Sequence, residues 1–310
     1  MRAVRFHEHG GPEVLRVEEV DRPAPGPGEV LVEVAATSFN PVDATIRGGE
    51  LRQVFPVSLP HVPGIDVAGT VAELGEGVDG FAVGDPVIGF LPMGAAGAAA
   101  EFVVAPAEVL TAAPSSIPLA DAAALPAVGL TAWQALVDHA DLRAGQRVLV
   151  NGAGGAVGGY AVQLAKLIGA HVVATASPRS ADLVRTAGAD QVVDHTAAIV
   201  VDAVDEPVDL VLNLAPVAPD DLAPLTALVK SGGLVLSTTA PPAEDVDRGV
   251  RAANVYVRGD AGQLAHLVSE VDAGRLVVHV GHRVGLDDLA AVHRDAPAGK
   301  VVVLAQPTER

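Results

Sequence analysis

The spacing of apolar and polar positions changes about a third of the way along the chain. Before that point, short apolar stretches are separated by turns rich in proline and glycine, of which residues 22–29 (RPAPGPGE) are the clearest. Short strands with such turns between them are typical of an all-β unit, and an irregular barrel is expected here. The expected strands are residues 14–20, 30–35, 67–74, 86–90 and 100–104.

From about residue 119 the pattern becomes an alternation of strands and helices. Residues 120–125 and 129–139 have helical spacing, and a last helix is expected at 262–275. Such alternation predicts a parallel, doubly wound sheet. Its expected strands are 148–151, 171–176, 191–194, 208–212 and 234–238. The strand at the end of the chain, 301–304, is expected to rejoin the barrel, so that residues 1–118 and 262–310 form one domain and residues 119–261 another.

A glycine-rich loop, 152–159 (GAGGAVGG), joins the first strand of the expected sheet to a long amphipathic helix. Small residues let the backbone approach a pyrophosphate, and the helix N-terminus offers unpaired N–H groups to it. A glycine string alone is more often only a turn, but the order strand, loop, helix, strand favours a dinucleotide site. The residues expected to contact the dinucleotide are Gly152, Gly155, Ala156, Val157 and Gly158.

The end of the second strand bears on which dinucleotide binds. NAD sites place Asp or Glu about 20 residues after the glycines, and residues 172–180 contain no acid. Ser177 and Arg179 stand there instead, and a hydroxyl and a guanidinium suit a 2′-phosphate. Arg179 is alternatively a solvated surface charge. We expect NADPH, bound in part by these two residues.

Composition narrows the class of protein further. The chain has 310 residues, no cysteine and a formal net charge of −18. The absence of cysteine excludes disulfides, a thiolate nucleophile and Cys-ligated zinc, and the acidity disfavours nucleic acid or an anionic membrane as a partner. No apolar run is long enough for a membrane span, and the amino terminus does not read as a secretory signal. A soluble, cytoplasmic protein is expected.

Several motifs occur together in one order: 38–43 (SFNPVD), 63–71 (PGIDVAGTV), 129–133 (GLTAW), the glycine loop, 183–190 and 299–304 (GKVVVL). With these motifs the chain resembles the medium-chain dehydrogenase/reductase superfamily, in its zinc-free quinone-oxidoreductase (zeta-crystallin-like) branch. The resemblance implies a GroES-like β-barrel catalytic domain with an inserted Rossmann domain. It also implies NADPH-dependent reduction of quinones or α,β-unsaturated carbonyl compounds.

The zinc-dependent alcohol dehydrogenases of the same superfamily are the competing assignment. By the resemblance, Asn40 stands at the position of their Cys ligand and Ile65 at that of their His ligand. An isoleucine cannot bind zinc, and the four cysteines of their structural-zinc lobe are missing. We therefore expect a metal-free enzyme.

Asn40 and Thr131 are the candidate catalytic residues. Asn40 precedes Pro41 and can simply begin a helix, on which Asp43 and Arg47 are expected to pair. The resemblance instead brings the Asn40 amide to the nicotinamide ribose or the substrate carbonyl, and one residue can do both. Phe39 either walls the nicotinamide pocket or fills core.

Thr131 is either a helix N-cap or, as the resemblance implies, a contact of the nicotinamide amide. Asn213 and Ser237 end neighbouring strands of the expected sheet, where ligands bind in doubly wound folds. Val257 is expected on an edge strand, near where relatives hold the nicotinamide. We also expect a homodimer formed through the sheet edge at residues 254–258.

The sequence says less about the substrate than about the cofactor. Thr45 stands where several quinone reductases have a tyrosine, and the chain shows no acid–base dyad. Hydride transfer needs orientation and exclusion of water, and solvent can protonate the product. A quinone or enone is the expected acceptor. The alternatives are an enoyl-thioester reductase of polyketide or fatty-acid metabolism and an NADPH-binding protein with little turnover.

Overall fold

The structure is a computed structural model, in which residues 1–306 are described. The chain forms two compact units: the first combines Met1–Ala127 with the segment from Gly259 onward, and the second is Val128–Arg258. The sequence pattern placed the first division earlier, at 118/119. The structure moves it because the 3₁₀-helix η3 (Leu119–Ala124) packs on strands of the first unit.

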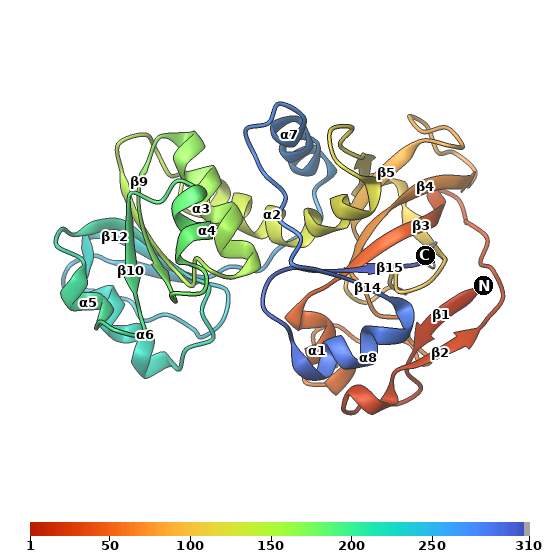
Figure 1. The fold of residues 1–310 in the computed structure, drawn as a ribbon, viewed down its shortest axis with the longest axis horizontal. Helices are drawn as coiled ribbons and strands as arrows, with labels where there is room; N and C mark the ends of the chain where they lie inside the picture. The colour runs from red at the N-terminus through yellow and green to blue at the C-terminus, as the bar shows by residue number, and fades with distance from the viewer. Residues whose placement is uncertain (307–310) are drawn as a thin grey trace. The chain divides into compact units, whose positions relative to one another are not determined.

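A seven-stranded sheet is the centre of the first unit (Figure 1). Its path runs β14-β15-β3-β4-β5-β7, with β6 pairing to β3. The bounds are β3 (Glu29–Phe39), β4 (Asp66–Leu74), β5 (Pro86–Phe90), β6 (Phe102–Pro106), β7 (Leu110–Ala112), β14 (His282–Gly285) and β15 (Val301–Leu304). Along β3, Val30, Val32 and Val34 lie in one core cluster, as the alternation of side chains along a strand requires. Of the residues between them, Glu33 is exposed and Leu31 is buried.

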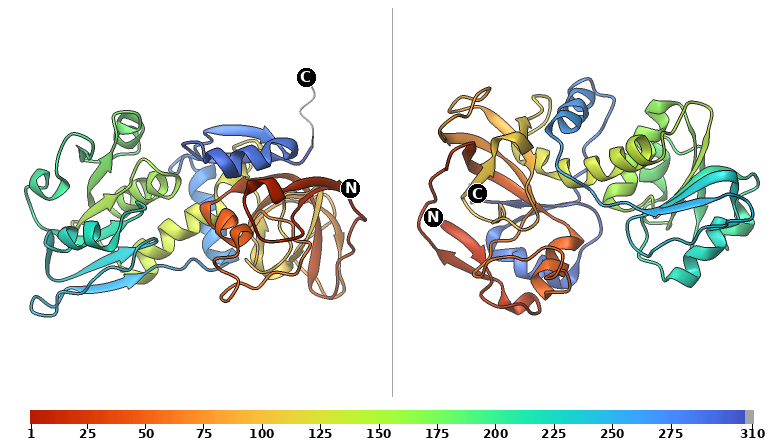
Figure 2. Two further views of the ribbon diagram at one scale, coloured as in Figure 1. Left: turned by 90° about the horizontal axis from the view of Figure 1, so that it is seen from below. Right: turned by 180° about the vertical axis from the view of Figure 1, so that it is seen from behind.

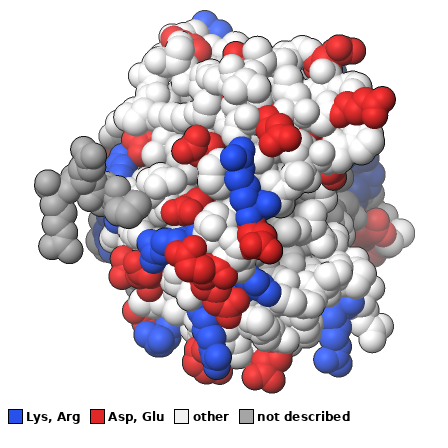
Figure 3. Space-filling model, turned by 90° about the vertical axis from the view of Figure 1, so that its right-hand side faces the viewer, with Lys and Arg blue, Asp and Glu red and all other residues white. Residues whose placement is uncertain are grey.

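The remaining elements of this unit surround that sheet. Strands β1 (Arg2–Arg5) and β2 (Arg16–Glu19) form a separate antiparallel pair. The α-helices are α1 (Pro41–Gly48), α7 (Ala261–Asp272) and α8 (Leu289–Asp295), and the short 3₁₀ turns are η1 (Pro12–Val14), η2 (Ala107–Val109) and η5 (Leu286–Asp288). On the face drawn in Figure 3, lysine and arginine side chains lie interspersed with acidic ones.

The end of the chain returns to the strands at its beginning. Strand β15 pairs antiparallel with β3, and Val301 lies opposite Phe39. Figure 2 shows this last strand, in blue, beside the red and orange N-terminal strands. The expectation that residues 301–304 rejoin the first sheet is confirmed.

The second unit is a six-stranded parallel sheet in the order β10-β9-β8-β11-β12-β13. Its strands are β8 (Arg147–Asn151), β9 (His171–Ala176), β10 (Gln191–Asp194), β11 (Val208–Asn213), β12 (Val229–Ser237) and β13 (Arg251–Asn254), and its helices are α3 (Ala156–Ile168), α4 (Ala181–Thr186), α5 (Val200–Ala203) and α6 (Pro219–Thr226). Helix α3 packs on β8 and β9, and α6 packs on β11 and β12. A core of valine and leucine lies between sheet and helices.

The helix expected at 129–139 begins earlier and changes type. Helix α2 (Pro126–Trp133) continues as a π-helix, η4 (Gln134–His139). Thr131 therefore lies inside α2, and its interpretation as an N-cap is wrong. Pro126 occupies the first turn, where a missing N–H costs nothing, and the Ala127 N–H is bound by the Asp66 carboxylate at 2.7 Å.

One expectation about local structure is wrong: Val257 is not in a strand. Strand β13 ends at Asn254 and its partner β12 ends at Ser237, and beyond these ends the Val255 N–H bonds the Ser237 carbonyl.

The loop at residues 94–100, which is rich in small residues, is tied to residues 62–64. A β-carbon on Gly97 would collide with the Pro63 backbone, and residues 97–99 donate hydrogen bonds to carbonyls of 62–64.

Candidate functional site

The glycine loop has the geometry that a dinucleotide requires. Gly152 has φ 88°, and a β-carbon there would lie 2.8 Å from the Ala215 nitrogen. Gly155 is the N-cap of α3, so Ala156, Val157 and Gly158 form the first turn, whose N–H groups are free of intrahelical partners. These residues fit a bound pyrophosphate, and an open groove lined in part by Asn151, Gly152 and Thr175 adjoins them.

A row of polar side chains crosses the carboxyl ends of four neighbouring strands. The Thr175 hydroxyl donates to Asn151 Oδ1 (2.8 Å), Asn151 Nδ2 donates to Asn213 Oδ1 (2.8 Å), and Asn213 Nδ2 donates to Ser237 Oγ (3.1 Å). The Gly152 N–H donates to Thr175 Oγ1 (2.8 Å), which ties the row to the glycine loop. The structure thus brings the expected residues Asn213 and Ser237 together, as parts of a scaffold that holds the loops.

Thr175, Asn151 and His195 line the groove and were missed by the sequence reasoning. A usable signal existed for the first two, because each is a polar residue at or next to the end of a strand, as Asn213 is. His195 directly follows β10, so it offered the same signal.

The Ser177–Ser180 turn places Arg179 beside the glycine loop. Ser180 donates its N–H to the Ser177 carbonyl at 3.0 Å, and a β-carbon on Gly154 would collide with the Ser180 hydroxyl. Arg179 is exposed, and within residues 1–306 it has no ion-pair or hydrogen-bond partner. The next cation along the chain, Arg185, is instead paired with Asp182 at 2.8 Å.

Asn40 lies at the start of α1 with both ends of its amide bound. Nδ2 donates to Asp66 Oδ2 at 2.8 Å, and Oδ1 accepts from the Lys300 ammonium at 2.7 Å. Its backbone N–H donates to Asp43 Oδ2 at 2.8 Å, which caps the helix. The backbone of Asn40 thus begins the helix, while its side chain belongs to a buried polar cluster. A role at the helix start therefore does not exclude a role of the side chain in binding.

Phe39 and Arg47 pack around His293. The Phe39 ring meets the His293 ring edge-on, with centroids 4.8 Å apart, and it is partly buried against a core cluster of the first unit. The expected Asp43–Arg47 ion pair is wrong. Arg47 donates to the Gly10 carbonyl (3.0 Å) and to His293 Nδ1 (2.8 Å), while Asp43 is held by backbone N–H groups.

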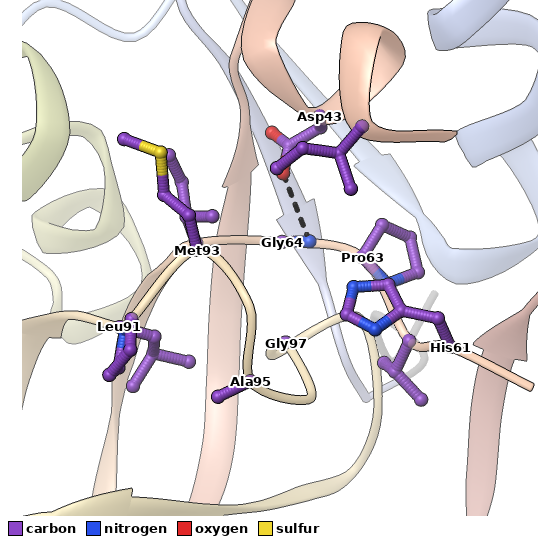
Figure 4. Close-up of a pocket in the computed structure, with 12 residues that line it drawn as sticks. Asp43, His61, Pro63, Gly64, Leu91, Met93, Ala95 and Gly97 are labelled. Atoms are coloured by element: carbon purple, nitrogen blue, oxygen red, sulfur yellow. Dashed lines mark hydrogen bonds between the residues drawn. The ribbon is translucent and has the colours of Figure 1, made fainter. Parts of the chain in front are cut away.

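Asp43 and His61 are two buried titratable groups on the wall of a small pocket (Figure 4). Burial raises the pKa of Asp43 to about 7, against the lowering effect of N–H donors from Asn40 and Gly64. Burial lowers the pKa of His61 to about 4, so its imidazole is neutral at pH 7. With a pKa of about 7, the Asp43 carboxyl on α1 can either hold or release a proton at neutral pH.

The remaining expected residues belong to the second unit. Thr131 is buried on α2, and Val257 is half-buried in the segment after β13. Phe39 and Asn40 are in the first unit, and every other expected site residue is in the second.

A catalytic zinc does not fit the residues at its family position. The Asn40 oxygen is occupied by an ammonium, and Ile65 is apolar and buried. Across residues 1–306, no group of three or more histidine, aspartate or glutamate side chains is placed to hold a metal ion. The same residues include no helix that is long and apolar enough to span a membrane.

Comparison with known proteins places the chain in a family. Residues 26–115 match the alcohol dehydrogenase GroES-like domain, and residues 156–262 match the zinc-binding dehydrogenase domain. A quinone oxidoreductase of Mus musculus is 32% identical over 98% of both chains. The chain belongs to the medium-chain dehydrogenase/reductase superfamily, in its quinone-oxidoreductase branch. The family and the fold class expected from the sequence are confirmed.

Other members of the superfamily match over different lengths. A chloroplast envelope quinone oxidoreductase homolog of Arabidopsis thaliana is 43% identical over 63% of this chain, and the match spans 61% of that relative's length. The solved structure of the Coxiella burnetii quinone oxidoreductase has a TM-score of 0.88 at 28% identity, covering 99% of both chains.

Two further solved structures of similar fold bear on cofactor and substrate. A mycobacterial protein complexed with NADPH has a TM-score of 0.85 at 30% identity, covering 98% of this chain and 99% of that one. The CurK enoyl reductase has a TM-score of 0.84 at 26% identity, covering 98% of both.

Proposed function

We propose that this protein is an NADPH-dependent, zinc-independent oxidoreductase that reduces quinones or α,β-unsaturated carbonyl compounds. The observation that carries the proposal is the Asn40 amide, which is bound between Lys300 and Asp66. The family resemblance puts this amide at the position of a zinc ligand. When bound, the reduced nicotinamide supplies a hydride from C4 to the acceptor. The glycine loop and α3 hold the pyrophosphate, and the Asn40 amide orients the acceptor carbonyl or the ribose.

The residue chemistry favours an acceptor that is already electron-poor. Asn40 and Ile65 offer no ligand set for a Lewis-acid metal, so hydrogen-bond donors are what this chain brings to an acceptor oxygen. A neutral amide donor stabilises a developing oxyanion less than a divalent metal does. Quinones and enones need less polarisation than saturated ketones, which makes them the better substrates.

Transfer of label tests the reaction class. Deuterium from C4-labelled NADPH should appear in the reduced enone, and Asn40→Ala should lower kcat on the order of 100-fold while the protein stays folded. Efficient reduction of saturated ketones would contradict the proposal. Preference for a pantetheine-linked enoyl thioester would favour the enoyl-reductase alternative, to which the CurK likeness points. Binding of NADPH without reduction of any acceptor would favour the other alternative, an NADPH-binding protein with little turnover.

Arg179 supports NADPH over NADH because it is an exposed cation beside the turn that packs on the glycine loop, and it has no partner among residues 1–306. Arg179→Ala should weaken NADPH binding about tenfold and leave NADH binding unchanged, since one charge-assisted contact to the 2′-phosphate is lost. Arg185→Ala is the matched control, because Arg185 is already paired with Asp182. Fluorescence titration of the unmodified protein and both variants with NADPH and with NADH measures the six affinities. Equal affinity of the unmodified protein for NADPH and NADH would rule out this preference.

We also propose a homodimer formed at the edge of the second unit's sheet. Strand β13 is the last in the sheet order, and Tyr256 just after it is 80% exposed. An open edge of this kind is a ready site for pairing with a second chain. Light scattering at micromolar concentration should give twice the chain mass, and Tyr256→Glu should lower it. A monomeric mass for the unmodified protein would remove the proposal.

A further inference from the structure

Lys300 is a buried cation whose position is set by strand register. It directly precedes β15, and because Val301 pairs with Phe39, Lys300 comes beside Asn40 at the end of β3. Only 4% of the residue is exposed. Its ammonium donates to Asn40 Oδ1 (2.7 Å), to Asp66 Oδ2 (3.3 Å) and to the Phe39 carbonyl (3.4 Å). All three hydrogens of the ammonium therefore have acceptors within the first unit.

Asp66 is the counter-charge and is fully buried. Its Oδ2 accepts from the Ser38 hydroxyl, from Asn40 Nδ2 and from Lys300, and its Oδ1 accepts from the Ala127 N–H. Each ion of such a pair loses its hydration when it is buried, and a protein with apolar residues of similar volume in its place is often as stable. Stability alone is therefore a weak reason for this sequence to hold a lysine here.

The pair determines which way the Asn40 amide faces. A flipped amide would set its N–H groups against the ammonium and its oxygen against the carboxylate, so only one orientation satisfies both neighbours. The ammonium also withdraws electron density from Oδ1, which strengthens the N–H groups on Nδ2 as donors. One of the two Nδ2 hydrogens points to Asp66, and the other has only a 3.5 Å contact with the Ser38 carbonyl.

We propose that Lys300 is a positioning residue for the reaction, acting through Asn40: its ammonium, neutralised by Asp66, fixes the orientation and donor strength of the Asn40 amide. The inference rests on the proposed function, in which that amide meets the acceptor carbonyl or the nicotinamide ribose. Lys300 itself touches neither acceptor nor cofactor in this proposal. A cation held by the chain thus takes over, through one amide, part of the orientation that metal coordination gives in zinc-dependent relatives.

The test is a mutant cycle between Lys300 and Asn40. Lys300→Met alone leaves Asp66 as an unpaired buried charge and can fail to fold, so the principal variant is Lys300→Met combined with Asp66→Asn, which keeps the region neutral. This variant should lower kcat between about 10- and 100-fold with KM for the acceptor little changed. In the Asn40→Ala background the same two substitutions should change kcat less than about twofold, because the group they position is gone. Lys230→Met, which removes a surface cation paired with Asp209, is the matched control and should leave kcat unchanged.

A second readout needs no turnover. In ¹⁵N-labelled protein, the Asn40 side-chain amide, assigned by its loss in Asn40→Ala, should exchange slowly with solvent, and the neutral double variant should speed that exchange at least about tenfold. Unchanged exchange in a folded double variant would overturn the positioning role, as would an equal loss of kcat in the Asn40→Ala background. Absence of turnover in every protein, with faster exchange in the variant, would instead count against the proposed function and leave Lys300 as the group that holds Asn40.

Discussion

Gly158→Ala should weaken NADPH binding by more than 100-fold and destabilise the protein by about 3 kcal/mol. A β-carbon on Gly158 would lie 2.5 Å from the Ala153 α-carbon and 2.5 Å from the Gly152 carbonyl oxygen. Both are backbone atoms of the loop that carries the pyrophosphate, so they cannot turn aside as a side chain would. The loop and the first turn of α3 must move apart, so their N–H groups no longer surround the position of the pyrophosphate.

The neighbouring glycine provides the control. A β-carbon on Gly159 would meet no atom within 4 Å, and the residue lies inside α3. Gly159→Ala should therefore raise the free energy of unfolding by up to about 1 kcal/mol, through helix propensity, and leave the NADPH affinity unchanged. Urea unfolding and fluorescence titration measure both quantities. Similar NADPH affinities in the two variants would show that close packing at Gly158 is not what shapes the site.

Two buried histidines should make the protein sensitive to mild acid. Burial, together with the charge of Arg47, lowers the pKa of His293 to about 3, and burial lowers that of His61 to about 4. Arg47 remains charged and donates to His293 Nδ1, so that atom must be the unprotonated one. Each folded-state pKa lies below the unfolded value of about 6.5, so the unfolded state takes up protons first and stability falls as the pH drops below 6.5.

Variants without each histidine measure how much His61 and His293 contribute to the loss of stability in acid. Between pH 7.5 and pH 5, each histidine should lower the free energy of unfolding by about 2 kcal/mol, because pH 5 lies about 1.5 units below the pKa of a histidine in the unfolded chain. Asp43 acts in the opposite direction: its raised pKa favours folding at low pH, and that contribution is lost as the pH rises from about 4 to 7. His61→Phe and His293→Phe should each therefore gain about 2 kcal/mol on the unmodified protein between pH 7.5 and pH 5. If the free energy of unfolding changed with pH in the same way in all three proteins, the buried histidines would not be the cause of the acid sensitivity.

Most of the strands and the dinucleotide loop could be predicted from the sequence because their signals are local. Period-two apolar patterns, turn residues and the glycine string each act within about a dozen residues. The buried cluster could not be predicted in that way. Lys300 and Asp66 are 234 positions apart, and nothing near either one indicates that β15 will deliver the lysine to Asn40. Arg47 was misassigned for the same reason, because His293, 246 positions away, offered a better partner than the local Asp43.

The return of β15 to β3 has a consequence for synthesis on the ribosome. Residues 128–258 are continuous in the chain and can fold as soon as they emerge, whereas the first unit lacks strands β14 and β15 until some forty further residues have followed. Until then residues 36–39 of β3 lack their partner strand, and Asp66 lacks the ammonium of Lys300. The nascent first unit is therefore open to chaperones, and to aggregation with other chains, for longer than the unit that is inserted into it.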